Sequence, residues 1–203
     1  MKSSKSRIPF VAMVAVAAAG ASAGSAQTPF DVVVEIPAGS AVKYEYDACA
    51  RRMRVDRFVQ MPVAYPANYG FIPGTLAGDG DPLDFLLFTR EPLVPGAIVA
   101  ARAIGVLRMV DGGEADEKVI AVPATGLDPA YDPVASLEDL GSAHVARLEQ
   151  FFQVYKRLPE EESGAVVLHG FGDAAEAERM VQSARRSAEE RAGDDEDCRA
   201  ERG

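Results

Sequence analysis

Three aspartates stand within six residues of this 203-residue chain, in a setting that suits metal chemistry. Asp79, Asp81 and Asp84 lie on a turn rich in glycine and proline, and an apolar run at residues 85–88 follows directly. Carboxylates that project from the end of a buried strand can hold a hard divalent cation, and Mg²⁺ binds such oxygens at about 2.0–2.1 Å. A cation would also remove the repulsion between crowded carboxylates. The turn is therefore a candidate metal site.

Two other interpretations of this turn need to be weighed. An ordinary Asx-rich turn explains the aspartates without any metal, because their side chains bond readily to the nearby backbone. An EF-hand calcium loop fits poorly, because its sixth position is Asp84 in place of glycine and its twelfth is Arg90 in place of glutamate.

A second acidic group lies at residues 111–117, where Asp111 and Asp116 precede Lys118. Alone, this segment is typical of a solvated hairpin tip. Four basic side chains stand at predicted strand or helix positions, namely Lys43, Arg57, Lys118 and Lys156. Tyr65, Tyr69 and Tyr155 add hydroxyl groups. Arg and Lys groups bind phosphate oxygens, while carboxylates hold the metal ions that face the same phosphate. The combined composition indicates a metal–phosphate site.

Strands precede helices along the chain. Alternating or β-branched patterns predict strands at residues 31–37, 42–47, 53–59, 85–89, 98–111, 118–123 and 165–168. Gly105 predicts a bulge or bend in the longest of them. A helical region opens at Ser136, and a capping-box-like pair, Asp173 and Glu176, starts a terminal helix over residues 174–191. This order predicts a mainly β (α+β) domain, a small closed barrel with helices outside.

The chain resembles the family I (soluble) inorganic pyrophosphatases at several motifs in the same order. The matching residues are 35–37, 43–47, 56–57, 65–70, 79–84, 105–109, 118–123 and 151–156. The resemblance implies a five-stranded OB-like closed β-barrel with two outer α-helices and an active site at the barrel mouth. It also implies Mg²⁺-dependent hydrolysis of pyrophosphate to two phosphates, with several metal ions per site and Mn²⁺ or Zn²⁺ as substitutes.

Matching motifs assign expected roles to individual residues. Asp79, Asp84 and Asp116 would ligate the activating metals, Asp111 would hold a substrate-bound metal, and Glu35 would act on metals through water. Asp81 would accept the proton of the attacking water. The expected phosphate-binding residues are Lys43, Arg57, Tyr69, Lys118, Tyr155 and Lys156, with Glu45 and Tyr65 in support. Gly112 departs from the family, because many members carry an acidic residue there, and its effect on the metal contact stays open.

Residues 1–26 have the pattern of a secretory signal peptide. A basic start is followed by a short apolar run and by small residues that allow cleavage after Ala23 or Ala26. The alternative, a transmembrane anchor, is disfavoured because the apolar run is shorter than the ~20 residues that span a bilayer. We expect a periplasmic or secreted protein without a stable membrane anchor after cleavage. Its catalytic domain would cover residues 27–186, with an acidic tail at 187–203.

Charge and cysteine content limit the partners. The chain has a formal net charge of −10, and without residues 1–26 the balance is 18 − 31 = −13. Such an acidic protein is not expected to bind nucleic acid, whose phosphates require the opposite charge. The resemblance implies pyrophosphate as substrate and a homo-oligomer, a hexamer in related bacterial proteins. The sequence leaves open whether Cys49 and Cys198 pair.

Two competing functions remain at this point. A non-catalytic OB-barrel could bind single-stranded nucleic acid through a basic groove, although the carboxylates of this site oppose that function. A metal-dependent phosphohydrolase could also have drifted to another substrate, because residues that hold pyrophosphate would hold any terminal diphosphate.

Overall fold

The computed structural model describes residues 27–157 and 166–191. Its β-strands are β1 (Phe30–Ile36), β2 (Val42–Asp47), β3 (Arg52–Phe58), β4 (Asn68–Phe71), β5 (Asp84–Leu87), β6 (Ile98–Asp111), β7 (Glu114–Ala115), β8 (Lys118–Pro123) and β9 (Val167–Asp173). Its helices are α1 (Leu137–Leu140), α2 (Ser142–Val154) and α3 (Ala174–Arg191). The predicted signal peptide, most of the predicted acidic tail and Cys198 lie outside the described residues. No helix within these ranges is long and apolar enough to cross a membrane.

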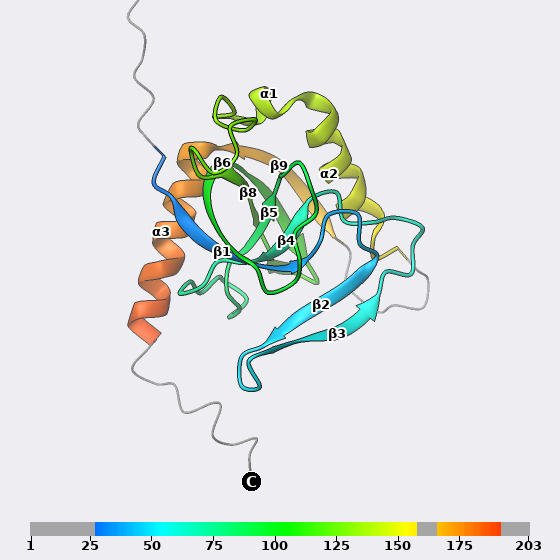
Figure 1. The fold of residues 1–203 in the computed structure, drawn as a ribbon. Coiled ribbons are helices and arrows are strands. Elements are labelled where there is room, and N and C mark those ends of the chain that lie inside the picture. Colours follow the sequence, from blue (N-terminus) through cyan, green and yellow to red (C-terminus); the bar gives the residue numbers. More distant parts are fainter. Residues whose placement is uncertain (1–26, 158–165, 192–203) are drawn as a thin grey trace, which may run out of the picture.

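Five strands form a closed circuit of pairings. Strand β1 pairs with β4, β4 with β5, β5 with β8, β8 with β6, and β6 with β1. Only the β5–β8 pairing is parallel. Figure 1 shows this circuit as a barrel, with α2 and α3 on its outside and the two-stranded β2–β3 hairpin projecting from it. The predicted mainly β fold is confirmed.

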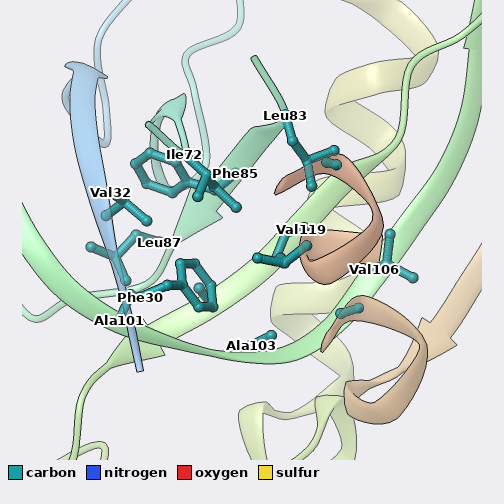
Figure 2. Packing of buried hydrophobic residues seen from close by; sticks show 14 of the residues in the cluster. Phe30, Val32, Ile72, Leu83, Phe85, Leu87, Ala101, Ala103, Val106 and Val119 are labelled. Carbon is teal, nitrogen blue, oxygen red and sulfur yellow. The ribbon is translucent and has the colours of Figure 1, made fainter. Parts of the chain in front are cut away.

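Alternating side chains of the barrel strands form two apolar clusters. Val119 and Ala121 of β8 belong to the first cluster, whereas Ile120 and Val122 belong to the second. Every residue of β8 is buried for this reason. The first cluster also receives α3, and the second receives α1 and α2. Figure 2 shows the side chains of the first cluster, such as Phe85 and Leu87, gathered between the strands.

Several local predictions need correction. The prediction of two helices was incomplete, because Gly141 at φ 95° interrupts the expected region and separates the short α1 from α2. Within the Gly/Pro-rich segment 65–84, the structure has one short strand, β4. Strand β9 runs to Asp173, well beyond the predicted end at residue 168. A register shift between Ala103 and Gly105 confirms the bulge in β6, and the predicted terminal helix coincides with α3.

Candidate functional site

A cavity of about 690 Å³ brings the predicted site residues together. All fourteen line it, namely Glu35, Lys43, Glu45, Arg57, Tyr65, Tyr69, Asp79, Asp81, Asp84, Asp111, Asp116, Lys118, Tyr155 and Lys156. They come from β1, the β2–β3 hairpin, the segment around β4 and β5, the β6–β8 region and the end of α2. Their assembly in one place was predicted; their individual roles remain predictions.

The parallel pairing of β5 and β8 creates the most buried polar contact of the cavity. It sets Asp84 beside Lys118 at the first position of each strand. The ammonium of Lys118, which is 2% exposed, donates to the carboxylates of both Asp84 and Asp116. Burial acts to lower the pKa of Lys118, but the two carboxylates raise it above its ordinary value. A charged lysine is therefore held between two carboxylates.

Tyr69 on β4 completes this group. Its hydroxyl donates to the same carboxylate oxygen of Asp84 that Lys118 contacts. Burial raises the pKa of Asp84, and burial together with the Asp84 charge raises the pKa of Tyr69 well above its usual value. Tyr69 thus keeps its proton and serves as a hydrogen-bond donor.

A bulge in β1 directs Glu35 toward the cavity. The register of β1 against β4 shifts between Val34 and Ile36, and such irregularities re-aim side chains. The Glu35 carboxylate accepts a hydrogen bond of 2.7 Å from the backbone N–H of Tyr46. Burial nevertheless raises the pKa of Glu35 to about 7, which that hydrogen bond only partly offsets. A nearby cation would favour the ionised form of this carboxyl.

Asp111, at the end of β6, meets the chain that follows α2. The ammonium of Lys156 contacts the Asp111 carboxylate, and the hydroxyl of Tyr155 donates to the same oxygen at 3.3 Å. The Tyr155 ring stacks on Phe151 with centroids 5.2 Å apart, which ties this corner to the second apolar cluster. The end of α2 is therefore fixed against the barrel at the cavity wall.

The β2–β3 hairpin contributes a more open group of charges. Lys43 and Arg57 are paired across the two strands. The Lys43 ammonium lies 2.6 Å from Glu45 and 3.3 Å from Asp56, and Arg57 lies 3.6 Å from the same Asp56 oxygen. Half of the Glu45 side chain and of the Arg57 side chain remain exposed.

Asp79 and Asp81 occupy the exposed turn before β5. The backbone N–H of Asp81 donates to the Asp79 side chain at 3.0 Å, so the Asx turn is present. Buried Thr75 stabilises the base of the turn, since its hydroxyl donates to Ile72 O and accepts from the Leu83 N–H. The Asp81 carboxylate is left facing the cavity from an exposed position.

Sequence reasoning missed two acidic residues of this region. Glu114 lines the cavity from β7, and Asp56 contacts both Lys43 and Arg57. Both lie in motifs that the sequence had singled out, Glu114 in the acidic turn and Asp56 beside Arg57. Asp56 lies at the register shift between β2 and β3, where Lys43 pairs with Arg57 and Tyr44 with Val55, and such irregularities re-aim side chains.

The donor set fits a hard metal ion in kind, because its candidate ligands are carboxylate oxygens. Within the described ranges, no three acidic, His or Cys side chains converge tightly enough to form a ready-made metal shell. Asp84 and Asp116 do reach a single cation, the Lys118 ammonium. In the same way, the Lys156 ammonium contacts the carboxylate of Asp111. A metal ion that bound these carboxylates would therefore have to displace the lysine ammonium groups.

Comparison with known proteins gives a consistent result. The family model described as inorganic pyrophosphatase matches residues 32–189. The inorganic pyrophosphatase of Gluconobacter oxydans is 46% identical over 154 residues, which are 76% of this chain and 88% of that protein. The inorganic pyrophosphatase of Rickettsia prowazekii is 44% identical over 153 residues, which are 75% of this chain and 88% of that protein. The structure of an inorganic pyrophosphatase from Coxiella burnetii superimposes with a TM-score of 0.76 at 40% identity, covering 82% of this chain and 98% of the other.

Proposed function

The chain belongs to the inorganic pyrophosphatase family, and we therefore propose that it hydrolyses pyrophosphate to two orthophosphates with the help of several Mg²⁺ ions. The observation that carries this proposal is the cavity, where five candidate metal ligands face six candidate phosphate donors. When bound, the metal ions would supply Lewis-acid activation of water and neutralise negative charge on the phosphate. Asp79, Asp84, Asp111 and Asp116 would hold them, with Glu35 acting through water.

The cationic side chains would hold the substrate. Lys118 and Lys156 are now bound to carboxylates, and phosphate oxygens would compete for the same ammonium groups. Lys43 and Arg57 line the cavity from the β2–β3 hairpin, where they can neutralise further charge on a bound diphosphate. Tyr69 and Tyr155 donate hydroxyl protons that burial keeps in place. Phosphoryl transfer depends mainly on such positioning and charge neutralisation.

Asp81 would act as the general base. Its carboxylate lies on the exposed turn at the cavity, and its own backbone N–H is bound to Asp79. A carboxylate within hydrogen-bond reach of the attacking water can accept its proton as the oxygen attacks phosphorus. In this account the chain needs no covalent nucleophile.

Phosphate release from pyrophosphate by the purified chain tests the function. We expect release in the presence of Mg²⁺ and its loss when EDTA removes the metal. Parallel assays with ATP and tripolyphosphate distinguish a pyrophosphatase from a phosphohydrolase of changed substrate. A folded protein that releases no phosphate from pyrophosphate, or that prefers ATP, would contradict the proposal.

We further propose that the protein is exported, to the periplasm or the medium. The basic, apolar and small-residue pattern of residues 1–26 supports this location. N-terminal sequencing of protein recovered from cells tests it. Cleavage after Ala23 would give a new terminus at Gly24, and cleavage after Ala26 would give one at Gln27. An intact Met1 would contradict export with cleavage.

A homo-oligomer is also proposed. Ile98 and Leu127 are 69% and 57% exposed and line a second cavity of about 620 Å³ on the barrel surface. Exposed apolar groups of this kind are typical of contact surfaces between proteins. Sedimentation velocity tests the assembly, and a hexamer is the expected species. A monomer at micromolar concentration would contradict it.

A further inference from the structure

Asn68, the first residue of β4, is fully buried and uses its whole hydrogen-bonding capacity. Its amide oxygen accepts from the backbone N–H of Ala38 at 3.1 Å and from that of Leu93 at 2.8 Å. Its amide nitrogen donates to Leu87 O at 3.1 Å and to the hydroxyl of Thr89 at 2.7 Å. An asparagine side chain offers two acceptor and two donor positions, so none of the four is left unused.

These four bonds join separate parts of the chain. Ala38 lies in the turn between β1 and β2, residues 37–41, which we call the hairpin root. Leu87 ends β5, and Thr89 and Leu93 belong to the segment between β5 and β6. Asn68 therefore fixes the hairpin root to the side of the barrel that β4 and β5 form.

The β2–β3 hairpin depends on this root for its orientation. Strands β2 and β3 form a separate two-stranded sheet, with no ladder of backbone hydrogen bonds to the described barrel strands. The backbone of Tyr65 holds the same root, because its O accepts from Gly39 N–H at 2.8 Å and its N–H donates to Ser40 O at 2.9 Å. Lys43 follows the root by two residues, and Arg57 pairs with it across the hairpin. A displaced root would therefore displace both cations.

We propose that Asn68 is a positioning residue for the substrate: it fixes the hairpin root so that Lys43 and Arg57 reach the phosphate groups of pyrophosphate. Asn68 does not line the cavity, whereas Lys43 and Arg57 do, so it acts through them. This inference rests on the proposed pyrophosphatase function and adds to it a residue to which neither the matching motifs nor the cavity lining assigns a role.

A second buried polar side chain shows what a purely structural role would look like. Arg102 on β6 is 5% exposed, and its guanidinium donates to Tyr131 O at 2.6 Å and to Val134 O at 2.5 Å. These partners lie in a segment that does not line the cavity. Loss of either Asn68 or Arg102 leaves buried polar groups unpaired, which lowers stability. Loss of Asn68 is expected to weaken substrate binding as well.

Amide hydrogen exchange of the wild-type chain tests the central contact without reference to activity. Ala38 is half-buried in a turn, and its N–H is bonded to the buried amide oxygen of Asn68. We expect this N–H to exchange at least about 100-fold more slowly than in the unfolded chain. In Asn68→Ala, exchange should rise at Ala38 and along residues 42–58, while α3 keeps its protection. An unprotected Ala38 in the wild-type chain would overturn the inference.

Kinetics of matched variants separate positioning from stability. We expect Asn68→Ala to raise KM for pyrophosphate at least about fivefold and to lower kcat less than about twofold. The Kd for imidodiphosphate with Mg²⁺, measured by calorimetry, should rise with KM. Arg102→Met should lower the Tm and leave KM unchanged. The milder Asn68→Ser, whose hydroxyl can replace one of the four bonds, should raise KM in the same direction and serves if Asn68→Ala does not fold.

Thr89→Val provides a closer control. It removes one partner of the amide nitrogen and leaves the bond between Asn68 and Ala38 in place, so KM should not change. An unchanged KM in the Asn68 variants, or an equal rise in Thr89→Val or Arg102→Met, would overturn the inference. A wild-type chain with a protected Ala38 that neither hydrolyses pyrophosphate nor binds imidodiphosphate would instead contradict the proposed function, and the positioning role would fail with it.

A double-mutant cycle tests the route through the hairpin. Combined with Lys43→Met, the Asn68 change should raise KM by less than the product of the two single effects, because one cation that Asn68 positions is already absent. Combined with Lys156→Met, the effects should multiply, because Lys156 follows α2 and is fixed separately. Multiplied effects in both combinations would overturn the proposed route.

Discussion

The barrel strands and the β2–β3 hairpin supply the same cavity with lysines and carboxylates, but in different surroundings. Lys118 starts a strand whose residues are all buried, and its ammonium is enclosed by Asp84 and Asp116. Lys43 lies on a strand without a fully buried residue, and its partner Glu45 is half-exposed. Buried ion pairs are costly to break, whereas exposed pairs contribute about 0–1 kcal/mol. We call the side of the cavity formed by the barrel strands, with Asp84, Asp116 and Lys118, the barrel wall, and the side formed by the β2–β3 hairpin the hairpin wall. We expect metal binding to change protein stability through the barrel wall. We expect the hairpin wall to affect mainly substrate binding.

The variant Lys118→Met should have the largest effect, because it leaves two half-buried carboxylates without their buried cation. We expect the free energy of unfolding to fall by about 3–5 kcal/mol without divalent metal and activity to fall by at least about 100-fold. Urea denaturation with EDTA and with Mg²⁺ measures the first effect, and Mg²⁺ should reduce the loss. Arg54→Met, whose largely exposed side chain pairs with Asp47 at 3.6 Å and does not line the cavity, is the control. An equal fall in the free energy of unfolding with and without Mg²⁺ would contradict the proposal that metal displaces Lys118 from its carboxylate partners.

Gly70→Ala tests the rigidity of the barrel wall. A Cβ on Gly70 would lie 2.1 Å from Val33 O and 2.9 Å from the backbone nitrogen of Glu35, both in β1. Because backbone atoms cannot move aside locally, we expect a loss of about 3 kcal/mol or more. Gly78→Ala is the matched control, since no atom lies within 4 Å of its added Cβ. Similar denaturation midpoints for the two variants would contradict a rigid β1–β4 contact.

Glu35 makes the stability of the folded protein depend on pH. Its pKa rises from 4.5 in the unfolded chain to about 7 in the folded protein. Between these values the folded state binds the proton more tightly, so stability falls as pH rises from about 4.5 to about 7 and levels off above. The change is about 3 kcal/mol at most for metal-free protein. Glu35→Gln should remove this slope from denaturation curves recorded at several pH values; an unchanged slope would assign it to other groups.

Lys43→Met should have the smallest effect on stability. Its ion pairs with Glu45 and Asp56 are partly exposed, so we expect a change below about 1 kcal/mol. KM for pyrophosphate should rise, because the hairpin loses one of the cations that we propose to bind phosphate. A destabilisation as large as that of Lys118→Met would contradict the expected difference in stability effect between the barrel wall and the hairpin wall.

Much of the site was predictable because its motifs are local in sequence. The aspartate turn at residues 79–84 and the strand 118–123 were recognisable from residue types and alternation alone. The terminal helix was equally clear, because Asp173 caps it through the N–H of Glu176 at 2.8 Å.

Long-range contacts were not predictable in the same way. The Asp84–Lys118 contact depends on a parallel pairing of β5 with β8, which no local pattern specifies. The orientation of Glu35 depends on a bulge in β1 relative to β4. Gly141, which separates α1 from α2, is a local signal for a helix end. It was overlooked because the residues on both sides have a helical pattern.

The most direct test of the central claim is kcat for phosphate release from pyrophosphate by Asp81→Asn, measured beside Asp31→Asn. Asp31 is an exposed residue of β1 that does not line the cavity, so the control makes the same chemical change elsewhere. With Asp81 as the general base, we expect Asp81→Asn to lower kcat by about 10²- to 10⁴-fold and Asp31→Asn to leave it unchanged. A wild-type kcat for folded Asp81→Asn would contradict the account.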